Sequence, residues 1–552
     1  MNKSLFSLCV CVHLKEEILY FCFIYMSNFL KIFCLTFCIG ITQVYGQITD
    51  SVFLKKSMGY SIQNPYIQYD KNTLEWYDKE AIYPFFEKLK NAKNKKVKIL
   101  HIGDSHIQPD ICTGVTRNKL QQVFGYGGRG LVFPYQVAGT ASAYDYTAYG
   151  TGNWISSKNV EYKPKLNLGL SGISIFTKDS TAGFKIIFKN KHATIRPEFT
   201  KIKVYCHKSP ESFSLKVSTN SSGYEKIIDF KNSDGLPYIE LELPKSSDSL
   251  IFKVAKTAPN QNFFECYGVE IENIEDEGVE YMSVGIAGAA YQSIFYQNKM
   301  KEQLEAIQPD LVIFDLGVNN FFKGPFDYQF VMGCLNQMIH FVKNTCPNAS
   351  FILPNSQDIY YKNRNVVNCM EYSLLTRLVA KEQKVALYDY FNITGGLHSM
   401  LNWSKDGLSN KDQCHLSGTG YRFKGELLFN GIMNGYLTFL NSKKENNLVF
   451  EVNQDTLNNR NWVIDKSIAK SCKLIEVEDK LTKYNVENLN QPQKVNTSKI
   501  SKVKDVVIYV KEGDTLQKLA TKNNISVEEL KRLNSLKSDK LIIGQKLKIK
   551  QL

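Results

Sequence analysis

A serine, a histidine and an aspartate at two places in the chain could together hydrolyse an ester. Ser105 lies in the sequence GDSH (103–106), and Asp412 and His415 lie in the sequence DQCH (412–415). A serine hydroxyl becomes a good nucleophile only when a positioned base removes its proton, and that base needs an anion or a carbonyl group to orient it. The short spacing lets one loop carry both Asp412 and His415. Taken alone, each motif has a structural alternative, because Ser105 could cap a helix and DQCH could be a surface loop.

Two glycine-containing loops could supply hydrogen-bond donors for the same reaction. Acyl transfer creates an oxyanion, and its donors must already be aimed at it. The sequence GIAG (285–288) could offer the backbone N–H of Gly288, and GVNN (317–320) could offer the side-chain amide of Asn319. An ordinary turn between a strand and a helix is the alternative for each loop.

Strands that alternate with helices are predicted to position these motifs. The predicted strands are residues 97–101, 310–316, 350–354 and 385–390, and the predicted helices are residues 111–124, 291–307 and 326–344. This alternation predicts a parallel sheet covered by helices on both faces. Ser105 and Asn319 each follow a predicted strand, at the carboxyl edge where such sheets bind ligands.

Residues 155–280 interrupt this pattern. They contain short alternating runs such as KIKVYCHK, SFSLKVS, YIELEL and LIFKVAK, separated by Asn, Ser, Gly and Pro. This predicts an inserted β-sandwich that divides the α/β domain into residues 47–154 and 281–442. Residues 443–505 are polar and rich in Lys, Asn and Ser, which is typical of a linker, and order is expected to return at residue 506.

The composition is that of a globular protein. Hydrophobic residues make up 43% and charged residues 22% of the 552 residues, which excludes wholesale disorder and a membrane protein with many spans. The net charge of +14 comes from Lys and Arg scattered along the chain, without the basic run interleaved with aromatics that a nucleic-acid groove needs. The charge indicates solubility and attraction to anionic surfaces or polymers rather than to nucleic acid.

The first 46 residues contain the pattern of a secretory signal. From Met26 onward, Lys31 precedes an apolar stretch at 32–41, and Val44-Tyr45-Gly46 offers a cleavage site before Gln47. We expect translation to start at Met26, residues 1–25 to be an upstream extension, and no transmembrane anchor to remain after cleavage. A membrane anchor made of two short apolar stretches is the alternative.

The cysteines do not predict a metal site. Of the 13 cysteines, eight follow residue 46, and these are widely spaced without a CxxC motif or a Cys/His pair. Zinc ligands have short characteristic spacings, so we expect neither a metal nor another cofactor. Export would permit disulfides, but the sequence does not fix their pairing.

In order and context, the motifs GDSH, GIAG, GVNN and DQCH resemble the four blocks of SGNH (GDSL-like) hydrolases. The resemblance covers roughly residues 75–440 apart from the insert. It implies a three-layer α/β/α fold, with Ser105 as nucleophile, His415 as base and Asp412 as the group that orients the base. It also implies an oxyanion hole formed by Ser105, Gly288 and Asn319.

One position departs from the pattern of this family. Asn320 stands where the family commonly has Asp, and we expect it to hold the loop rather than to take part in the chemistry. His106, which has no evident carboxylate partner, is expected to be structural or to line the cleft.

The first block extends as GDSHIQPDICTGVTRNKLQQVFGYGGRGLVFPY (103–135), and this longer sequence resembles the subgroup that contains bacterial peptidoglycan O-acetylesterases. In that subgroup GDSH is likewise followed by a helix and a glycine-rich stretch. The glycine-rich residues 125–130 lack the Lys-Ser/Thr ending of a phosphate cradle. We expect them to form a rigid loop near the cleft.

The C-terminal residues 506–552 resemble a single LysM module. The order is strand, helix, helix and strand, and the segments YVKEGDTLQKLA, NNIS, LKRLN and IIGQKLKI match that family. LysM modules bind polymers that contain N-acetylglucosamine, such as peptidoglycan and chitin. The resemblance implies glycan contacts at Gly513, Asp514, Thr515, Leu516, Leu541, Ile542 and Ile543. A small domain that serves only as a spacer is the alternative.

These features predict a bacterial serine esterase, exported to the periplasm or cell surface, that removes O-acyl groups from peptidoglycan or a related glycan through an acyl-serine intermediate. Two other functions stay open. The same fold could serve a lipase, a thioesterase or another polysaccharide esterase, and a degenerate hydrolase domain could belong to a non-catalytic wall-binding protein.

Overall fold

The chain divides into two compact units, Met1–Glu476 and Val477–Leu552, which are described separately. The computed structural model describes residues 54–189, 199–220, 223–230, 235–442, 504–510 and 514–522, together with parts of 530–551. The expected signal peptide at 1–46 and residues 443–503 of the expected linker lie outside these ranges.

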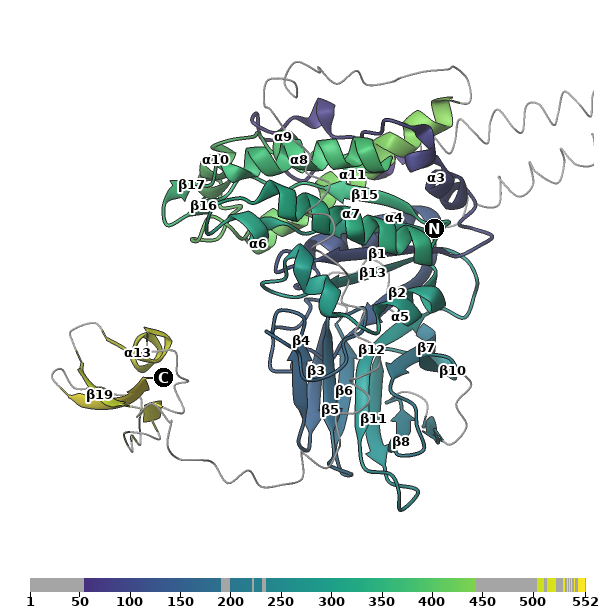
Figure 1. Ribbon diagram of the computed structural model, residues 1–552, viewed down its shortest axis with the longest axis vertical. Helices are drawn as coiled ribbons and strands as arrows, with labels where there is room; N and C mark the ends of the chain where they lie inside the picture. Colours follow the sequence, from purple (N-terminus) through teal and green to yellow (C-terminus); the bar gives the residue numbers. More distant parts are fainter. Residues whose placement is uncertain are drawn as a thin grey trace, which may run out of the picture. The chain divides into compact units, whose positions relative to one another are not determined.

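Six parallel strands form the part of the first unit that carries the candidate motifs (Figure 1). In spatial order they are β2 (Tyr126–Val132), β13 (Val279–Gly285), β1 (Val97–Gly103), β14 (Leu311–Asp315), β15 (Ser350–Pro354) and β18 (Ala386–Tyr388). The register places Gly103 opposite both Gly285 and Asp315. Three strands therefore end together at the edge of the sheet where GDSH, GIAG and GVNN begin.

Alternating side chains of these strands pack against helices on the two faces. On one face Val97 and Ile99 share a core with helices α3 (Tyr83–Lys90), α4 (Ile111–Phe124) and α11 (Gly418–Ser442). On the other face Leu100 and Ile102 share a core with α5 (Met300–Ile307), α7 (Tyr328–Thr345) and α8 (Asn368–Gln383). The predicted three-layer arrangement is confirmed, because successive side chains of a strand point to opposite faces.

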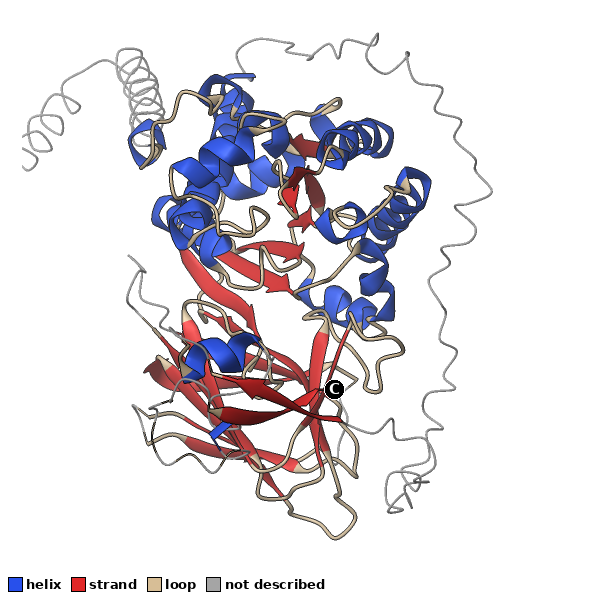
Figure 2. Cartoon of the chain, turned by 90° about the vertical axis from the view of Figure 1, so that its left-hand side faces the viewer, coloured by secondary structure: helices blue, strands red, loops and turns tan. Residues whose placement is uncertain are grey.

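Short elements connect these layers at their ends. They are η1 (Tyr69–Lys71), η2 (Lys79–Ala81), η3 (Tyr291–Tyr296), α6 (Val318–Phe321), β16 (Tyr360–Tyr361), β17 (Arg364–Asn365), α9 (Tyr390–Ile393) and α10 (Ser399–Lys405). Figure 2 shows the helices of the first unit gathered around one half of its strands.

Residues 146–272 form two facing sheets, whose first strand lies before residue 155, where the insert was expected to begin. One consists of β3 (Tyr146–Thr151), β6 (Gly183–Phe188), β11 (Ser249–Ala255), β8 (Ser214–Ser218) and β9 (Glu225–Ile228). The other consists of β4 (Ile155–Lys158), β5 (Ile173–Thr177), β7 (Phe199–Cys206), β10 (Tyr238–Ser247) and β12 (Phe264–Glu272). The rings of Phe188 and Phe199 meet between the sheets with centroids 5.5 Å apart.

The second of these two sheets, which contains β12, is continuous with the parallel sheet. β12 pairs antiparallel with β2, so a single 11-stranded sheet runs from the insert into the α/β domain. The pairing covers an edge of the parallel sheet that would otherwise expose unpaired backbone groups. The alternating sequence pattern predicts the two layers but not this shared sheet.

The helix expected at residues 291–307 is divided into η3 and α5. Between them the Asn298 side chain accepts a hydrogen bond from the N–H of Leu168, and the N–H of Lys299 donates to the carbonyl of Leu168. These bonds to the insert replace bonds that a continuous helix would make. Sequence periodicity cannot reveal this competition, because the partner segment lies far away in the chain.

The prediction of a rigid glycine-rich loop near the cleft is wrong. Residues 126–132 form strand β2, and Tyr126 and Gly128 pair with the beginning of β13, away from the edge that carries Ser105. A Cβ atom at Gly130 would lie 2.4 Å from Met282 Cγ. The missing side chain therefore lets β2 approach its neighbour closely.

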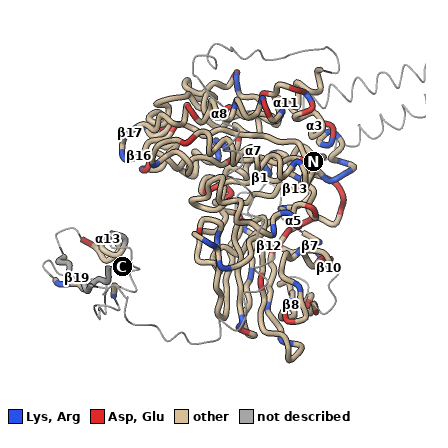
Figure 3. Tube along the Cα trace, in the orientation of Figure 1, with Lys and Arg blue, Asp and Glu red and all other residues tan. Residues whose placement is uncertain are grey.

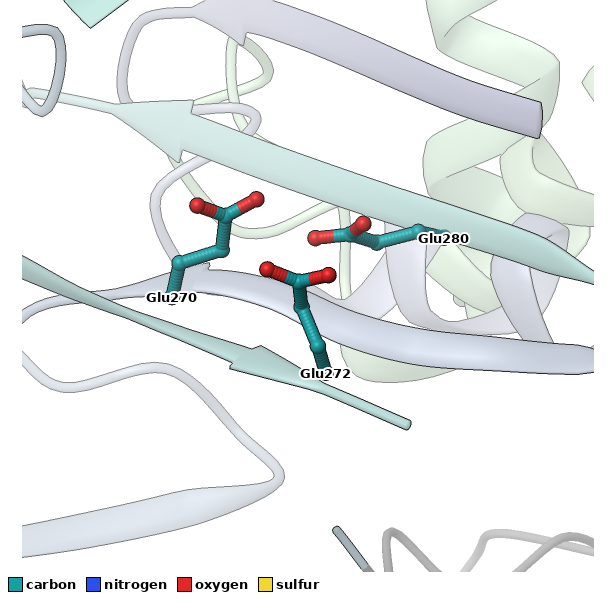
Figure 4. Close-up of side chains that lie close together, drawn as sticks. All are labelled: Glu270, Glu272 and Glu280. Atoms are coloured by element: carbon teal, nitrogen blue, oxygen red, sulfur yellow. The ribbon is translucent and has the colours of Figure 1, made fainter. Parts of the chain in front are cut away.

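Three buried glutamates lie together where the insert joins the parallel sheet (Figure 4). Glu270 and Glu272 belong to β12, and Glu280 belongs to β13. Lysines at 96, 98, 201 and 203 form ion pairs with Glu270 or Glu272. Neither carboxylate oxygen of Glu280 has a hydrogen-bond partner among the described residues. Burial and the neighbouring Glu270 raise the pKa of Glu280 well above its usual value.

We expect Glu280→Gln to increase the free energy of unfolding at neutral pH. A carboxyl group with a raised pKa in the folded state stabilises the fold fully below the unfolded value near 4.3, and loses about 1.4 kcal/mol of that stability per pH unit as the pH rises toward the folded value. Denaturant unfolding between pH 4.5 and 8 should show that the free energy of unfolding of the variant increases relative to that of the wild type as the pH rises.

Glu272→Gln is the matched control, because Glu272 lies in the same cluster. Burial opposes its ionisation, but Lys203 and Lys98 outweigh burial and lower the pKa of Glu272 to about 2. This variant should be less stable than the wild type at neutral pH. Destabilisation by Glu280→Gln at pH 7 would instead mean that Glu280 is ionised within the lysine network.

The second unit contains β19 (Lys504–Tyr509), α13 (Leu516–Lys522) and β20 (Lys546–Gln551). β19 and β20 pair antiparallel, with Val506 opposite Ile549. Leu516, Leu519 and Leu547 are buried in its small core. The hydroxyl of Thr515 accepts a hydrogen bond from the N–H of Lys518 and so caps α13.

Charge and hydropathy add little to this picture. Figure 3 shows Lys and Arg interspersed with Asp and Glu along the described chain. None of the helices in the described ranges combines the length and the apolar composition of a membrane span.

Candidate active site

Ser105 lies in a tight turn directly after β1. The N–H groups of Ile107 and Gln108 both donate to the carbonyl of Asp104, which closes one helical turn around the serine. Two glycines make room for this turn. A Cβ atom at Gly103 would lie 2.1 Å from a side-chain carbon of Ile107, and one at Gly285 would lie 2.5 Å from the Gln108 nitrogen. The turn can therefore pack closely against the ends of β1 and β13.

The structure brings Ser105, His415 and Asp412 into one hydrogen-bonded chain. Ser105 Oγ lies 2.9 Å from His415 Nε2, and His415 Nδ1 lies 2.7 Å from Asp412 Oδ2. With Asp412 ionised, Nδ1 of His415 carries the hydrogen and Nε2 is free to accept the proton of Ser105. This is the geometry that a serine nucleophile and its base require.

Asp412 is held in its ionised form. Burial raises its pKa, but hydrogen bonds from the His415 side chain and from the N–H groups of His415 and Cys414 outweigh burial and lower it. The loop is tied at two further points, because Asn410 N–H donates to the His415 carbonyl and Gln357 Nε2 donates to the Cys414 carbonyl. The carboxylate therefore orients the imidazole from a fixed position.

Two backbone N–H groups near the nucleophile could donate hydrogen bonds to a bound substrate. The N–H groups of Ser105 and Gly288 have no acceptor among the described residues. Gly288 has a φ of +87°, a conformation that favours glycine, and its loop begins at the end of β13. Donors without a protein acceptor at the edge of a site are what an oxyanion hole needs.

Asn319 lies on the first turn of α6, after β14. Its Nδ2 donates to Ala289 O at 2.9 Å and to Asp104 Oδ2 at 3.2 Å. Both amide hydrogens therefore have protein acceptors, and donation to an oxyanion requires that one of these bonds be shared or exchanged. Asn320 faces elsewhere, because its Oδ1 accepts from Tyr291 N–H and its Nδ2 donates to Gln292.

Family comparisons agree with this geometry. A model of the GDSL-like lipase/acylhydrolase family matches residues 267–423, and a LysM domain model matches residues 508–550. The chain carries a GDSL-like hydrolase domain and a LysM domain. The hydrolase match includes GIAG, GVNN and DQCH but begins after GDSH. The insert separates GDSH from these three motifs in the sequence. The fold brings the serine of the hydrolase domain back to the other three motifs.

One solved structure supports the fold of the hydrolase domain. A peptidoglycan O-acetylesterase is similar at a TM-score of 0.55 and 22% identity, over 66% of this chain and 99% of that chain. A family two carbohydrate esterase from Cellvibrio japonicus has a TM-score of 0.23 and 10% identity, over 53% of this chain and 99% of that one. The second score is too low to indicate a shared overall fold. No curated protein sequence matches the chain.

The residues expected to contact glycan in the LysM domain have different surroundings. Thr515 is exposed and Asp514 is half-buried, whereas Leu516 is buried in the core and Leu541 packs against it. The side chain of Leu516 is therefore directed inward rather than toward a ligand. Gly513, Ile542 and Ile543 lie outside the described residues.

Two side chains of the hydrolase domain were not predicted to belong to the site. Asp104 is buried, accepts from the N–H of His106 and from Asn319, and has its pKa raised to about 7 by burial. Tyr421, on α11, reaches His106 with its hydroxyl. Only the neighbourhood of GDSH and DQCH in the sequence could have drawn attention to them.

Proposed function

We propose that this protein is an exported serine esterase that removes O-acetyl groups from peptidoglycan or a related glycan containing N-acetylglucosamine. The observation that carries this proposal is the hydrogen-bonded chain from Ser105 through His415 to Asp412, in a protein that also has a LysM domain. LysM domains bind such glycans. The similar peptidoglycan O-acetylesterase supports the proposal through its fold.

The geometry supports a two-step reaction. His415 Nε2 takes the proton of Ser105 while Oγ attacks the acyl carbonyl carbon, and the N–H groups of Ser105 and Gly288 stabilise the oxyanion with Asn319. The sugar oxygen then leaves with the proton from His415. In the second step His415 takes a proton from water, the resulting hydroxide attacks the acyl-serine, and acetate is released as Ser105 regains its proton. Asp412 remains a carboxylate throughout and stabilises the imidazolium.

The openness of the site supports a polymer as substrate. The side chains of His415 and Asp412 are 36% and 52% exposed. A Cβ atom at Gly288 would lie 3.8 Å from Val160 Cγ1, so the loop that carries Val160 borders the oxyanion donors. Tyr162 on the same loop is 85% exposed and offers an aromatic face to a sugar ring. An acetyl group needs little enclosure, whereas a long glycan needs an open approach.

The N-terminal sequence supports export. The positively charged and apolar segment from Met26 to Gly46 has the order of a secretory signal, and peptidoglycan lies outside the cytoplasm. We therefore infer a location in the periplasm or at the cell surface.

Release of acetate from O-acetylated peptidoglycan and acetylated xylan, and release of nitrophenol from short-chain and long-chain nitrophenyl esters, test the substrate class. We expect acetylated peptidoglycan and short-chain esters to be hydrolysed, and we expect a chain that lacks residues 443–552 to retain the short-chain activity while losing rate on insoluble peptidoglycan. The polar sequence of residues 443–505 predicts a linker, and a flexible chain of about 60 residues would span roughly 40 to 45 Å, so an anchored hydrolase domain could reach nearby glycan repeatedly.

A point variant separates loss of the LysM fold from loss of chain length. Leu547→Asp places a charge in the buried core of the LysM domain and should have the same effect as the truncation. Preference for long-chain esters would favour a lipase, and a truncated chain that binds and deacetylates insoluble peptidoglycan as well as the full chain would remove the targeting role.

A further inference from the structure

The ring of His106 lies against the ring of His415. The two centroids are 5.0 Å apart and the rings are tilted by only 25°, so they are stacked. His106 itself is only 4% exposed. One face of the His415 imidazole is therefore covered by a buried, flat neighbour, although 36% of the His415 side chain remains open to solvent.

Tyr421 fixes the position of His106. Its hydroxyl lies 3.0 Å from His106 Nδ1, and the two rings meet edge to face with centroids 5.9 Å apart. Tyr421 is itself secured at the start of α11, because its N–H donates to the carbonyl of Ser417 at 2.8 Å. Helix α11 begins shortly after His415 in the sequence. The side chain of Tyr421, in its first turn, therefore links this segment to His106, whose ring contacts His415.

Hydrogen bonding alone does not explain a histidine at position 106. Its Nε2 is buried without a hydrogen-bond partner among the described residues, and burial of a polar atom that lacks a partner destabilises the fold. Burial, Lys424 and His415 lower the pKa of His106 to about 3. The ring is therefore neutral during turnover and does not repel His415 when His415 becomes imidazolium.

We propose that His106 and Tyr421 form a positioning pair that keeps the His415 ring in the orientation needed to reach Ser105 and Asp412 together. The inference rests on the proposed serine esterase function. Without the stacked ring, His415 can rotate or tilt, and its two hydrogen bonds are no longer held in one geometry. A displacement of about 1 Å in a reacting group can reduce the rate by about 10²-fold.

His106→Ala should lower kcat for a short-chain nitrophenyl ester by about 10- to 100-fold, with KM nearly unchanged. His106→Phe keeps a flat ring on His415 and should recover most of the lost rate. Tyr421→Phe should give an intermediate loss, because the ring of His106 stays in place but is less firmly held. The rate at which a fluorophosphonate labels Ser105 should follow kcat across these variants.

Tyr360→Phe is the matched control. The Tyr360 hydroxyl lies 3.0 Å from Nδ1 of His398, the same type of bond, but His398 is not stacked on His415. This control should leave kcat unchanged. Thermal unfolding of each variant separates positioning from folding, because kcat should follow the presence of a ring at 106 rather than the unfolding temperature.

Two results would contradict the proposal that His106 and Tyr421 position the His415 ring. One is a His106→Ala variant that turns over the ester as fast as the wild type, and the other is a His106→Phe variant that is as impaired as His106→Ala while remaining folded. A wild-type protein that neither hydrolyses esters nor reacts with the fluorophosphonate would instead overturn the proposed function, and the positioning pair with it.

Discussion

Ser105→Ala should reduce ester turnover on the order of 10⁶-fold, the loss known from removal of a triad serine. The substitution removes the Oγ atom that forms the acyl-enzyme and that lies 2.9 Å from His415 Nε2. The fold should be preserved, because a small, partly exposed side chain is shortened without opening a cavity in the core. Turnover of a nitrophenyl acetate and fluorophosphonate labelling measure the effect.

Two controls make this prediction specific. Ser209→Ala, in the loop between β7 and β8, should leave turnover and labelling unchanged. Binding of the Ser105→Ala protein to insoluble peptidoglycan should equal that of the wild type, because the LysM domain is intact. Substantial remaining turnover in Ser105→Ala would rule out the acyl-serine mechanism, whatever the substrate.

Asn319→Ala should lower kcat by about 10²-fold or more, as expected on losing one oxyanion donor, with little change in KM. The Asn319 amide lies between Asp104 Oδ2 and Ala289 O in the free protein. We expect one of these two bonds to be exchanged for the oxyanion as the tetrahedral intermediate forms. Steady-state kinetics on a short-chain ester measure the two parameters separately.

Asn320→Asp is the matched control for this variant. Position 320 accepts a hydrogen bond from Tyr291 N–H at 3.1 Å, and a carboxylate oxygen can accept the same bond. This control should retain a kcat close to that of the wild type. An effect of Asn319→Ala confined to KM would assign Asn319 to substrate binding instead.

Local sequence patterns predicted most of the elements that carry the site. The helix expected at 111–124 has the bounds of α4, and the strand expected at 350–354 has the bounds of β15. These patterns work because side chains that share a face recur at a fixed spacing within one element. Helix α8 (Asn368–Gln383) was not predicted, although its apolar and polar faces are separated about as weakly as those of α4.

Predictions that depended on distant partners were less complete. The glycine-rich residues 125–130 are typical of a loop when taken alone, yet their glycines are needed because β13 lies so close to β2. The break between η3 and α5 depends on hydrogen bonds to Leu168, more than a hundred residues earlier in the chain. No window of local sequence contains both partners of such contacts.

The residue types of the candidate site and their order could be predicted from local sequence, because the motifs GDSH, GIAG, GVNN and DQCH are each local. Local sequence could not show that Ser105 and His415, 310 positions apart, lie within hydrogen-bond distance of each other in the fold. The tertiary structure also decided that His106 stacks on His415. The physical reason is that a side chain's neighbours across the fold are set by how strands and helices pack, and that packing is a property of the whole chain.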